Sequence, residues 1–267
     1  MREAKHNLRF PERGAHPLGA ADHARLAEQP RQGVRGLYAP PPRTAAQRAL
    51  KRAIDFVIAL AGGIASLPLC AVIAAAIRLE SRGPAIFTAK RIGENGKPFT
   101  LYKFRSMVED AETRLDSLAH LNEGGKFMVK IPVDPRVTRV GRILRKYSLD
   151  EIPQMWNVIR GDMSMVGPRP QAPDEVAQYD DYQRRRLAAP AGITGWWQVT
   201  ARHDPRFEVW VEKDLEYIDN WSIRLDLTIL VRTFGVILGG RDASPRAARP
   251  DAAPAGGSSQ SSRGAEG

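Results

Sequence analysis

The sequence has little cysteine, and several common motifs of catalysis and nucleotide binding are missing from it. Cys70 is the one cysteine among 267 residues, so intrachain disulfides and cysteine-ligated metal sites are excluded. The chain contains no P-loop, Gly-x-Gly-x-x-Gly or Gly-x-Ser-x-Gly motif. His203 has no second histidine at ligand spacing, so a tightly held zinc ion is not expected.

Acidic residues are also in deficit. Lys and Arg number 40 against 30 Asp and Glu, which gives a formal net charge of +10. Such a balance suits an anionic partner, which could be nucleic acid, a phosphorylated small molecule or an anionic membrane surface. The basic N-terminal region lacks the interleaved aromatic residues of a single-strand nucleic-acid binder.

Both ends of the chain lack apolar periodicity. Residues 1–47 are rich in Pro, Arg and Ala, and residues 241–267 are rich in Pro, Ala, Gly and Ser. Segments of this kind bury too little apolar surface to offset the loss of chain entropy on folding. The sequence therefore predicts a disordered basic arm, a folded body over about residues 48–240, and a disordered tail.

Against these absences stands one long apolar run, Phe56–Ile77, which has 22 residues and no charge. At a rise of about 1.5 Å per residue, a helix of this length can cross the hydrocarbon core of a bilayer. Pro68 lies near its middle, where a proline kinks or breaks a helix, and basic residues flank both ends. We therefore expect a re-entrant helix that enters the membrane, bends and returns to the same face. The alternative is a buried helix of a soluble core.

The other patterns predict an α+β fold, mainly helical with one small β-hairpin or sheet. The expected elements are a hairpin over 85–104, helices over 108–125, 173–190 and 207–221, a strand or loop over 191–202, and a packed or interfacial helix over 225–238. A short basic helix is expected within 134–151, followed by a helix that Ser148 or Asp150 caps, with Pro153 in its first turn.

Asp150 and Glu151 are the candidate catalytic pair. Adjacent helical residues point about 100° apart, so the two carboxyl groups are not expected to share a proton. An ionised aspartate at a helix start is available as a nucleophile toward phosphorus, and a divalent metal would offset its repulsion from an anionic substrate. Arg145 and Arg169 carry guanidinium forks that suit phosphate oxygens. The alternatives are acids that merely begin a helix and arginines that are surface charges.

Four stretches together resemble one family. They are 51-KRAID-55, 90-KRIGENGKPFTLYKFRSM-107, 134-DPRVTRVGRILRKYSLDEIPQMWNVIRGDMSMVGPRP-170 and 192-GITGWWQV-199. The family is the monotopic phosphoglycosyl transferases, bacterial sugar transferases that start exopolysaccharide and O-glycan assembly. The resemblance covers about residues 48–240, with a re-entrant membrane helix over 48–80 and a single catalytic domain over 81–240.

The resemblance implies a two-step reaction. Asp150 attacks the β-phosphate of a UDP-sugar and releases UMP, and polyprenyl phosphate then takes the phosphosugar from the enzyme. Mg²⁺ is held by Asp150 and Glu151, and Glu151 assists at the metal or in proton transfer. The family keeps its substrate-binding side chains at the positions of Lys103, Arg145, Arg169 and Gln198.

The same resemblance places the protein on the cytoplasmic face of the bacterial inner membrane, where the inner-leaflet lipid meets its basic flanks. Lys51 and Arg52 are expected to face lipid phosphates, and Ser66 and Pro68 to break the membrane helix. Many relatives have Ser directly before this proline, whereas Leu67 intervenes here. Later-acting glycosyltransferases are expected as partners, and nucleic acid is not.

Two other readings remain open from the sequence. One is a non-catalytic membrane-bound scaffold that binds a nucleotide sugar as a sensor, and the other is a basic nucleic-acid-binding protein. Retention of the acidic pair together with the three cations disfavours the first. The apolar run and the lack of a nucleic-acid-reading motif disfavour the second. The GWWQV motif and the segment 108–133 are most similar to hexose transferases that use UDP-glucose or UDP-galactose.

Overall fold

The computed structural model describes residues 44–122, 131–202, 204 and 206–239. The predicted arm (1–47) and tail (241–267) fall almost entirely outside these residues, as does His203. The α-helices are α3 (Ala45–Glu80), α4 (Arg139–Lys146), α5 (Gln154–Arg160), α6 (Pro173–Ala177), α7 (Asp181–Arg184), α8 (Trp196–Thr200), α9 (Phe207–Asp219) and α10 (Ile223–Gly239). The strands are β1 (Ile86–Ile92), β2 (Pro98–Phe104), β3 (Ser164–Val166) and β4 (Gly192–Thr194). Helices thus predominate, as the sequence predicts, and the described residues form two small sheets where one was expected.

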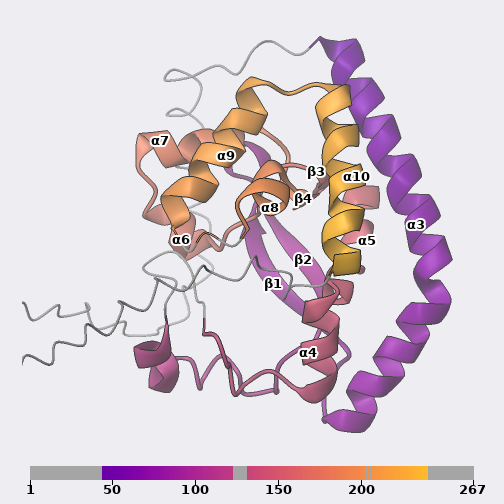
Figure 1. The fold of residues 1–267 in the computed structure, drawn as a ribbon, viewed down its shortest axis with the longest axis vertical. Helices are drawn as coiled ribbons and strands as arrows, with labels where there is room; N and C mark the ends of the chain where they lie inside the picture. The colour runs from indigo at the N-terminus through magenta and orange to yellow at the C-terminus, as the bar shows by residue number, and fades with distance from the viewer. Residues whose placement is uncertain (1–43, 123–130, 203, 205, 240–267) are drawn as a thin grey trace, which may run out of the picture.

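Helix α3 contains the long apolar run. Thr44 caps its start, because the threonine hydroxyl accepts from the backbone N–H of Gln47 and the Gln47 side chain accepts from that of Thr44. The helix is long and apolar enough to cross a membrane, with a mean hydropathy of 2.4 over its most apolar window, of which 11% is buried. In Figure 1 it bows along the right-hand edge of the molecule, and both of its ends approach the rest of the chain.

The break expected at Ser66 and Pro68 is not present as an interruption, because α3 continues through Pro68 to Glu80. The Ser66 hydroxyl donates to the backbone carbonyl of Gly63, 2.9 Å away, inside the helix. A proline within a helix removes one backbone hydrogen bond and bends the axis. The bow of α3 is consistent with that effect.

Polar side chains attach the two ends of α3 to the same body. At the N-terminal end, Lys51 Nζ lies 2.7 Å from Asp226 Oδ2 of α10. Arg52 donates to the carbonyls of Val158 and Ile159 at the end of α5. At the C-terminal end, both Glu80 carboxylate oxygens accept from backbone N–H groups in the first turn of α4.

These contacts correct the prediction that Lys51 and Arg52 face lipid phosphates. Lys51 is only 7% exposed, and the Arg52 guanidinium is occupied by two protein carbonyls. The lysine is buried because a carboxylate from α10, distant in sequence, neutralises it. In the structure, both side chains fasten α3 to the body.

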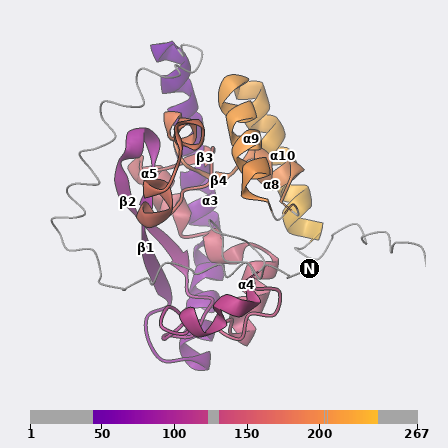
Figure 2. The same ribbon diagram turned by 90° about the vertical axis from the view of Figure 1, so that its left-hand side faces the viewer.

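Strands β1 and β2 form the expected hairpin, with Ile86 opposite Phe104 and Ile92 opposite Pro98. Their turn contains Asn95 with φ 55° and Gly96 with φ 74°. Phe99 and Leu101 are buried on one face of β2, and strand alternation puts Lys103 next on that face. Figure 2 shows the hairpin on one side of α3 and helices α8, α9 and α10 on the other.

Two apolar cores hold these parts together. The larger joins β2, α5, β3, α9 and α10 through residues that include Leu101, Val158 and Ile229. The smaller lies under the C-terminal half of α3 and is formed by Ile73, Ile77, Phe104 and Leu144. Both cores therefore pack α3 against the elements that surround the candidate site.

The predictions of one continuous helix over 108–125 and another over 173–190 are wrong. The first region has turns and a 3₁₀ helix, Asp116–Leu121, and the second is divided among α6, α7 and the 3₁₀ helix Arg185–Ala188. A short amphipathic helix depends on burial of its apolar stripe. Leu121 is 42% exposed, so that stripe lacks a full packing partner.

Candidate active site

The acidic pair lies in the connection between α4 and α5. Ser148 has the left-handed φ of 56°, uncommon for a residue other than glycine, and it turns the chain into the 3₁₀ helix Leu149–Glu151. Pro153 is the N-cap of α5 and does not lie within its first turn. Ser148 is thus the N-cap of a helical turn, but that turn is the 3₁₀ helix of the acids, and the Ser148 side chain makes no capping hydrogen bond. The expectation that Pro153 lies in the first turn of the same helix is corrected.

Asp150 and Glu151 are 6% and 8% exposed, and their carboxylates have different surroundings. Asp150 Oδ1 is buried and has no hydrogen-bond partner among the described residues. Glu151 Oε1 lies 3.5 Å from Arg169 Nη1. An unpartnered carboxylate oxygen in a buried position is energetically unfavourable, and a bound cation or ligand at that oxygen would relieve the cost.

Lys103 lies in one electrostatic group with Asp150 and with two other cations predicted from the sequence, Arg145 and Arg169. Burial lowers the pKa of Lys103 to about 8, and the positive charges of Arg169, Arg145 and Arg91 act in the same direction. Asp150 opposes this effect and raises the Lys103 pKa. Arg145 is further oriented by Ser106, whose hydroxyl oxygen accepts from Arg145 Nε at 2.9 Å.

Like charges gathered in a partly buried space repel one another, and an anionic ligand relieves that repulsion. The mutual proximity of Lys103, Arg145 and Arg169 therefore suits a phosphate-bearing substrate. Arg91 of β1 belongs to the same electrostatic group and was not singled out from the sequence. In the sequence, Arg91 stands beside Lys90 in the hairpin, and nothing there distinguishes it from an ordinary surface charge.

The loop that carries Arg169 is built on a close approach of two backbones. β3 and β4 pair in parallel, Gly167 N–H donates to the Thr194 carbonyl, and Gly192 N–H donates to the Pro168 carbonyl, each at 2.9 Å. A Cβ on Gly167 would collide with the Pro190 carbonyl, so only glycine fits there. Pro168 and Pro170 then restrict the backbone on both sides of Arg169.

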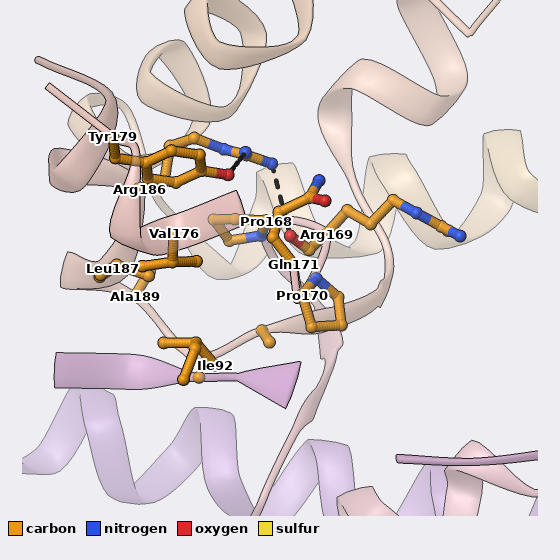
Figure 3. A pocket seen from close by; sticks show the side chains of 12 residues that line it. Ile92, Pro168, Arg169, Pro170, Gln171, Val176, Tyr179, Arg186, Leu187 and Ala189 are labelled. Atoms are coloured by element: carbon orange, nitrogen blue, oxygen red, sulfur yellow. Dashed lines mark hydrogen bonds between the residues drawn. The ribbon is translucent and has the colours of Figure 1, made fainter. Parts of the chain in front are cut away.

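Figure 3 shows a small pocket behind this loop, with Ile92 on one side and Val176 and Leu187 on another. The Arg169 side chain extends away from the pocket, while Tyr179 and Arg186 line its inner wall. The Arg169 guanidinium lies 5.9 Å from the Trp197 ring centroid. Trp197, Tyr179 and Arg186 were not predicted as site residues, because their separation in sequence gives no sign that they meet Arg169.

Gln198 lies on α8, directly after Trp197. Its role in substrate binding stays a prediction. The helix itself is close to the site, since Trp197 contacts Arg169 from there.

Asp150 and Glu151 are the residues that could hold a metal ion. Within the described ranges, no group of three or more His, Cys, Asp or Glu side chains could do so. Mg²⁺ is commonly bound through one or two carboxylates together with substrate phosphates, so a pair is sufficient. The unpartnered oxygen of Asp150 fits such an ion.

The sequence was compared with protein families and with known proteins, and the two comparisons agree. The model of the family described as bacterial sugar transferase matches residues 46–240. The galactosyl transferase CpsE of Streptococcus agalactiae is 43% identical over 198 residues, 72% of this chain and 43% of CpsE. The exopolysaccharide production protein ExoY of Sinorhizobium fredii is 39% identical over 191 residues, 70% of this chain and 84% of ExoY.

The undecaprenyl-phosphate galactose phosphotransferase of Salmonella typhimurium is 41% identical over 197 residues, 72% of this chain and 41% of that protein. The chain thus spans less than half the length of CpsE and of the Salmonella protein, but most of the length of ExoY.

Proposed function

This chain belongs to the bacterial sugar transferase family, and on that premise we propose that it transfers a sugar 1-phosphate from a UDP-sugar to polyprenyl (undecaprenyl) phosphate. The observation that carries the proposal is that Lys103 interacts electrostatically with Asp150, Arg145 and Arg169, while one carboxylate oxygen of Asp150 is buried without a partner among the described residues. Both substrates and both products are phosphates, so this charge pattern matches the reaction.

In the first step, Asp150 attacks the β-phosphorus of the UDP-sugar. A bond forms between the carboxylate oxygen and phosphorus, and the bond from phosphorus to the bridging oxygen breaks, so UMP leaves with the electron pair. In the second step, a phosphate oxygen of polyprenyl phosphate attacks the same phosphorus and the Asp150 carboxylate leaves. Polyprenyl-diphospho-sugar is the product, and the enzyme returns to its initial state.

The cations have a defined task in both steps. Charge develops on the phosphoryl oxygens and on the leaving oxygen, and fixed positive groups stabilise it without reorganisation. Arg169, whose loop is restricted by prolines on both sides, provides a fork that matches phosphate geometry. A Mg²⁺ ion on Asp150 and Glu151 would neutralise negative charge on the diphosphate when bound.

Helix α3 supports a monotopic placement. Lys51 and Glu80, near its opposite ends, contact the same body, while Ile64 and Leu67 in its middle are 60% and 61% exposed. A helix that spanned the bilayer would separate its ends by the membrane thickness, with one on each side. We propose that α3 is re-entrant and that the catalytic face lies at the cytoplasmic surface of the inner membrane, where UDP-sugars and the lipid phosphate meet.

The proposal is tested with purified protein in vesicles, a panel of radiolabelled UDP-sugars and undecaprenyl phosphate. The expected result is UMP release and a labelled lipid product with UDP-glucose or UDP-galactose. Binding of a UDP-sugar without UMP release or lipid product, with every sugar tried, would contradict the enzyme and favour the sensor.

A further inference from the structure

A buried ion pair lies behind the loop that carries Arg169. Arg186 donates from Nε and Nη2 to the same Asp214 oxygen, at 2.8 Å and 2.6 Å. The two residues are 3% and 0% exposed and come from different elements, the 3₁₀ helix Arg185–Ala188 and α9. Apolar residues of similar volume often stabilise a fold as well as a buried ion pair does, so stability alone does not account for it.

The remaining donors of Arg186 connect the pair to the active-site loop. Nη1 donates to the Tyr179 hydroxyl at 2.7 Å, and Nη2 reaches the backbone carbonyl of Arg169 at 3.4 Å. Figure 3 shows both interactions as dashed lines. Burial raises the pKa of Asp214 to about 6, against the opposing effects of Arg186 and of the Arg169 backbone N–H. The backbone carbonyl of Arg169 therefore faces the ion pair.

The side chain of Arg169 leaves the loop on the opposite side. Its guanidinium lies 3.5 Å from Glu151 and 5.9 Å from the Trp197 ring centroid. Because prolines restrict the backbone at both neighbouring positions, a displacement at the Arg169 carbonyl moves the guanidinium with it. A misplacement of about 1 Å in a substrate-positioning group can lower the rate about a hundredfold.

We infer that Arg186, Asp214 and Tyr179 are positioning residues, which set the place of the Arg169 guanidinium from behind its loop. This inference rests on the proposed function. It differs from a packing role in one measurable respect, since the effect on catalysis must pass through the Arg169 side chain.

A double-mutant cycle tests this dependence. Arg186→Lys keeps a positive charge but loses the fork, and we expect it to lower kcat/KM for the UDP-sugar about tenfold or more in the otherwise native protein. In an Arg169→Ala background the same change should alter kcat/KM less than about twofold, because no guanidinium remains to be positioned. An equal loss in both backgrounds would overturn the inference.

An uncharged replacement of the whole network distinguishes loss of folding from loss of positioning. The triple variant Tyr179→Phe, Arg186→Met, Asp214→Leu removes the network while filling its volume, and we expect a near-native melting temperature with low kcat/KM. Native kcat/KM in this variant would contradict positioning. If replacement of all three residues unfolds the protein, Tyr179→Phe alone serves as the test, because it leaves the ion pair in place. This change must lower kcat/KM in the native protein and leave it unchanged in the Arg169→Ala background.

The neighbouring residue supplies a matched control. Arg185 pairs with Asp219 at 3.2 Å near the surface, and its replacement by Lys should leave kcat/KM unchanged. Failure of the unmodified protein to release UMP from any UDP-sugar would reject the proposed function itself. UMP release with an additive cycle would reject only the positioning role.

Discussion

Lys103 connects the geometry of the site to a pH profile. Burial and the charges of Arg169, Arg145 and Arg91 lower its pKa to about 8, so its proton is lost at a moderately alkaline pH. Because the pKa is lowered, the charged form is present below about pH 8 and disappears as the pH rises through that value. The substrate diphosphate is already fully ionised at this pH, and the uracil N3–H titrates only at a higher pH, so a change centred near pH 8 belongs to the enzyme.

We therefore predict that kcat/KM for the UDP-sugar is level below pH 8 and falls above it, since this parameter reports the free enzyme. Lys103→Arg should keep the charge and extend the plateau to higher pH. The measurement is a pH series of initial rates of UMP release at low substrate concentration. An alkaline limb that the arginine variant leaves in place would assign the titration to another group.

Part of the site could be predicted at the scale of single residues and part could not. Asp150, Glu151 and Arg169 lie in one stretch of sequence with a recognisable motif, and Glu151 and Arg169 are in contact in the structure. Arg186 and Asp214 meet across 28 positions of sequence, and each alone reads as an ordinary charge. The prediction for Lys51 was wrong for the same reason, because a lysine before an apolar run gives no sign that it pairs with a buried aspartate on α10.

At the scale of elements, α3 supports the candidate active site in addition to its proposed role as a membrane anchor. Lys51 Nζ reaches the Val166 carbonyl at 3.3 Å, and Asp55 accepts from the Met165 N–H at 3.2 Å, three and four residues before Arg169. Glu80 caps α4, which carries Arg145 and leads to Asp150. The two ends of one helix therefore hold the two segments that form the site.

Replacement of Lys51 tests this support. In Lys51→Met the buried Asp226 loses its cation while Tyr217 and Trp221 still donate to it, and we expect the free energy of unfolding to fall by about 3 kcal/mol. Denaturant unfolding in detergent or vesicles measures the change. Lys97→Met is the control, because Lys97 is exposed in the hairpin turn and should change stability little. Equal stability of the two variants would show that the pair does not fasten α3.

Strong local patterns predicted their elements well. The hairpin over 86–104 follows from alternation around a turn rich in Gly and Asn, which is a local signal. The helix expected over 108–125 also had a local signal, but Leu121 is exposed and Leu115 and Leu118 are only partly buried, and tertiary packing decides such cases. The parallel pairing of β3 with β4 joins three-residue strands far apart in sequence, so periodicity could not reveal it.

At the scale of the whole molecule, the central question is on which side of the membrane each end of α3 lies. Single cysteines at positions 45 and 97, in a Cys70→Ala background, can be labelled from either side of sealed inner-membrane vesicles. We predict that an impermeant maleimide labels both positions from the cytoplasmic side only, because both ends of α3 attach to one body. Labelling from opposite sides would show a spanning helix and reject the re-entrant placement.

The account depends most directly on the covalent role of Asp150. The protein is incubated with a UDP-sugar labelled in the β-phosphate and the sugar, without lipid acceptor, and the denatured chain is digested and analysed by mass spectrometry. We predict that label attaches to Asp150, that one UMP is released for each labelled chain, and that Asp150→Asn abolishes both. Labelled lipid product from the Asp150→Asn variant, once polyprenyl phosphate is supplied, would contradict the mechanism.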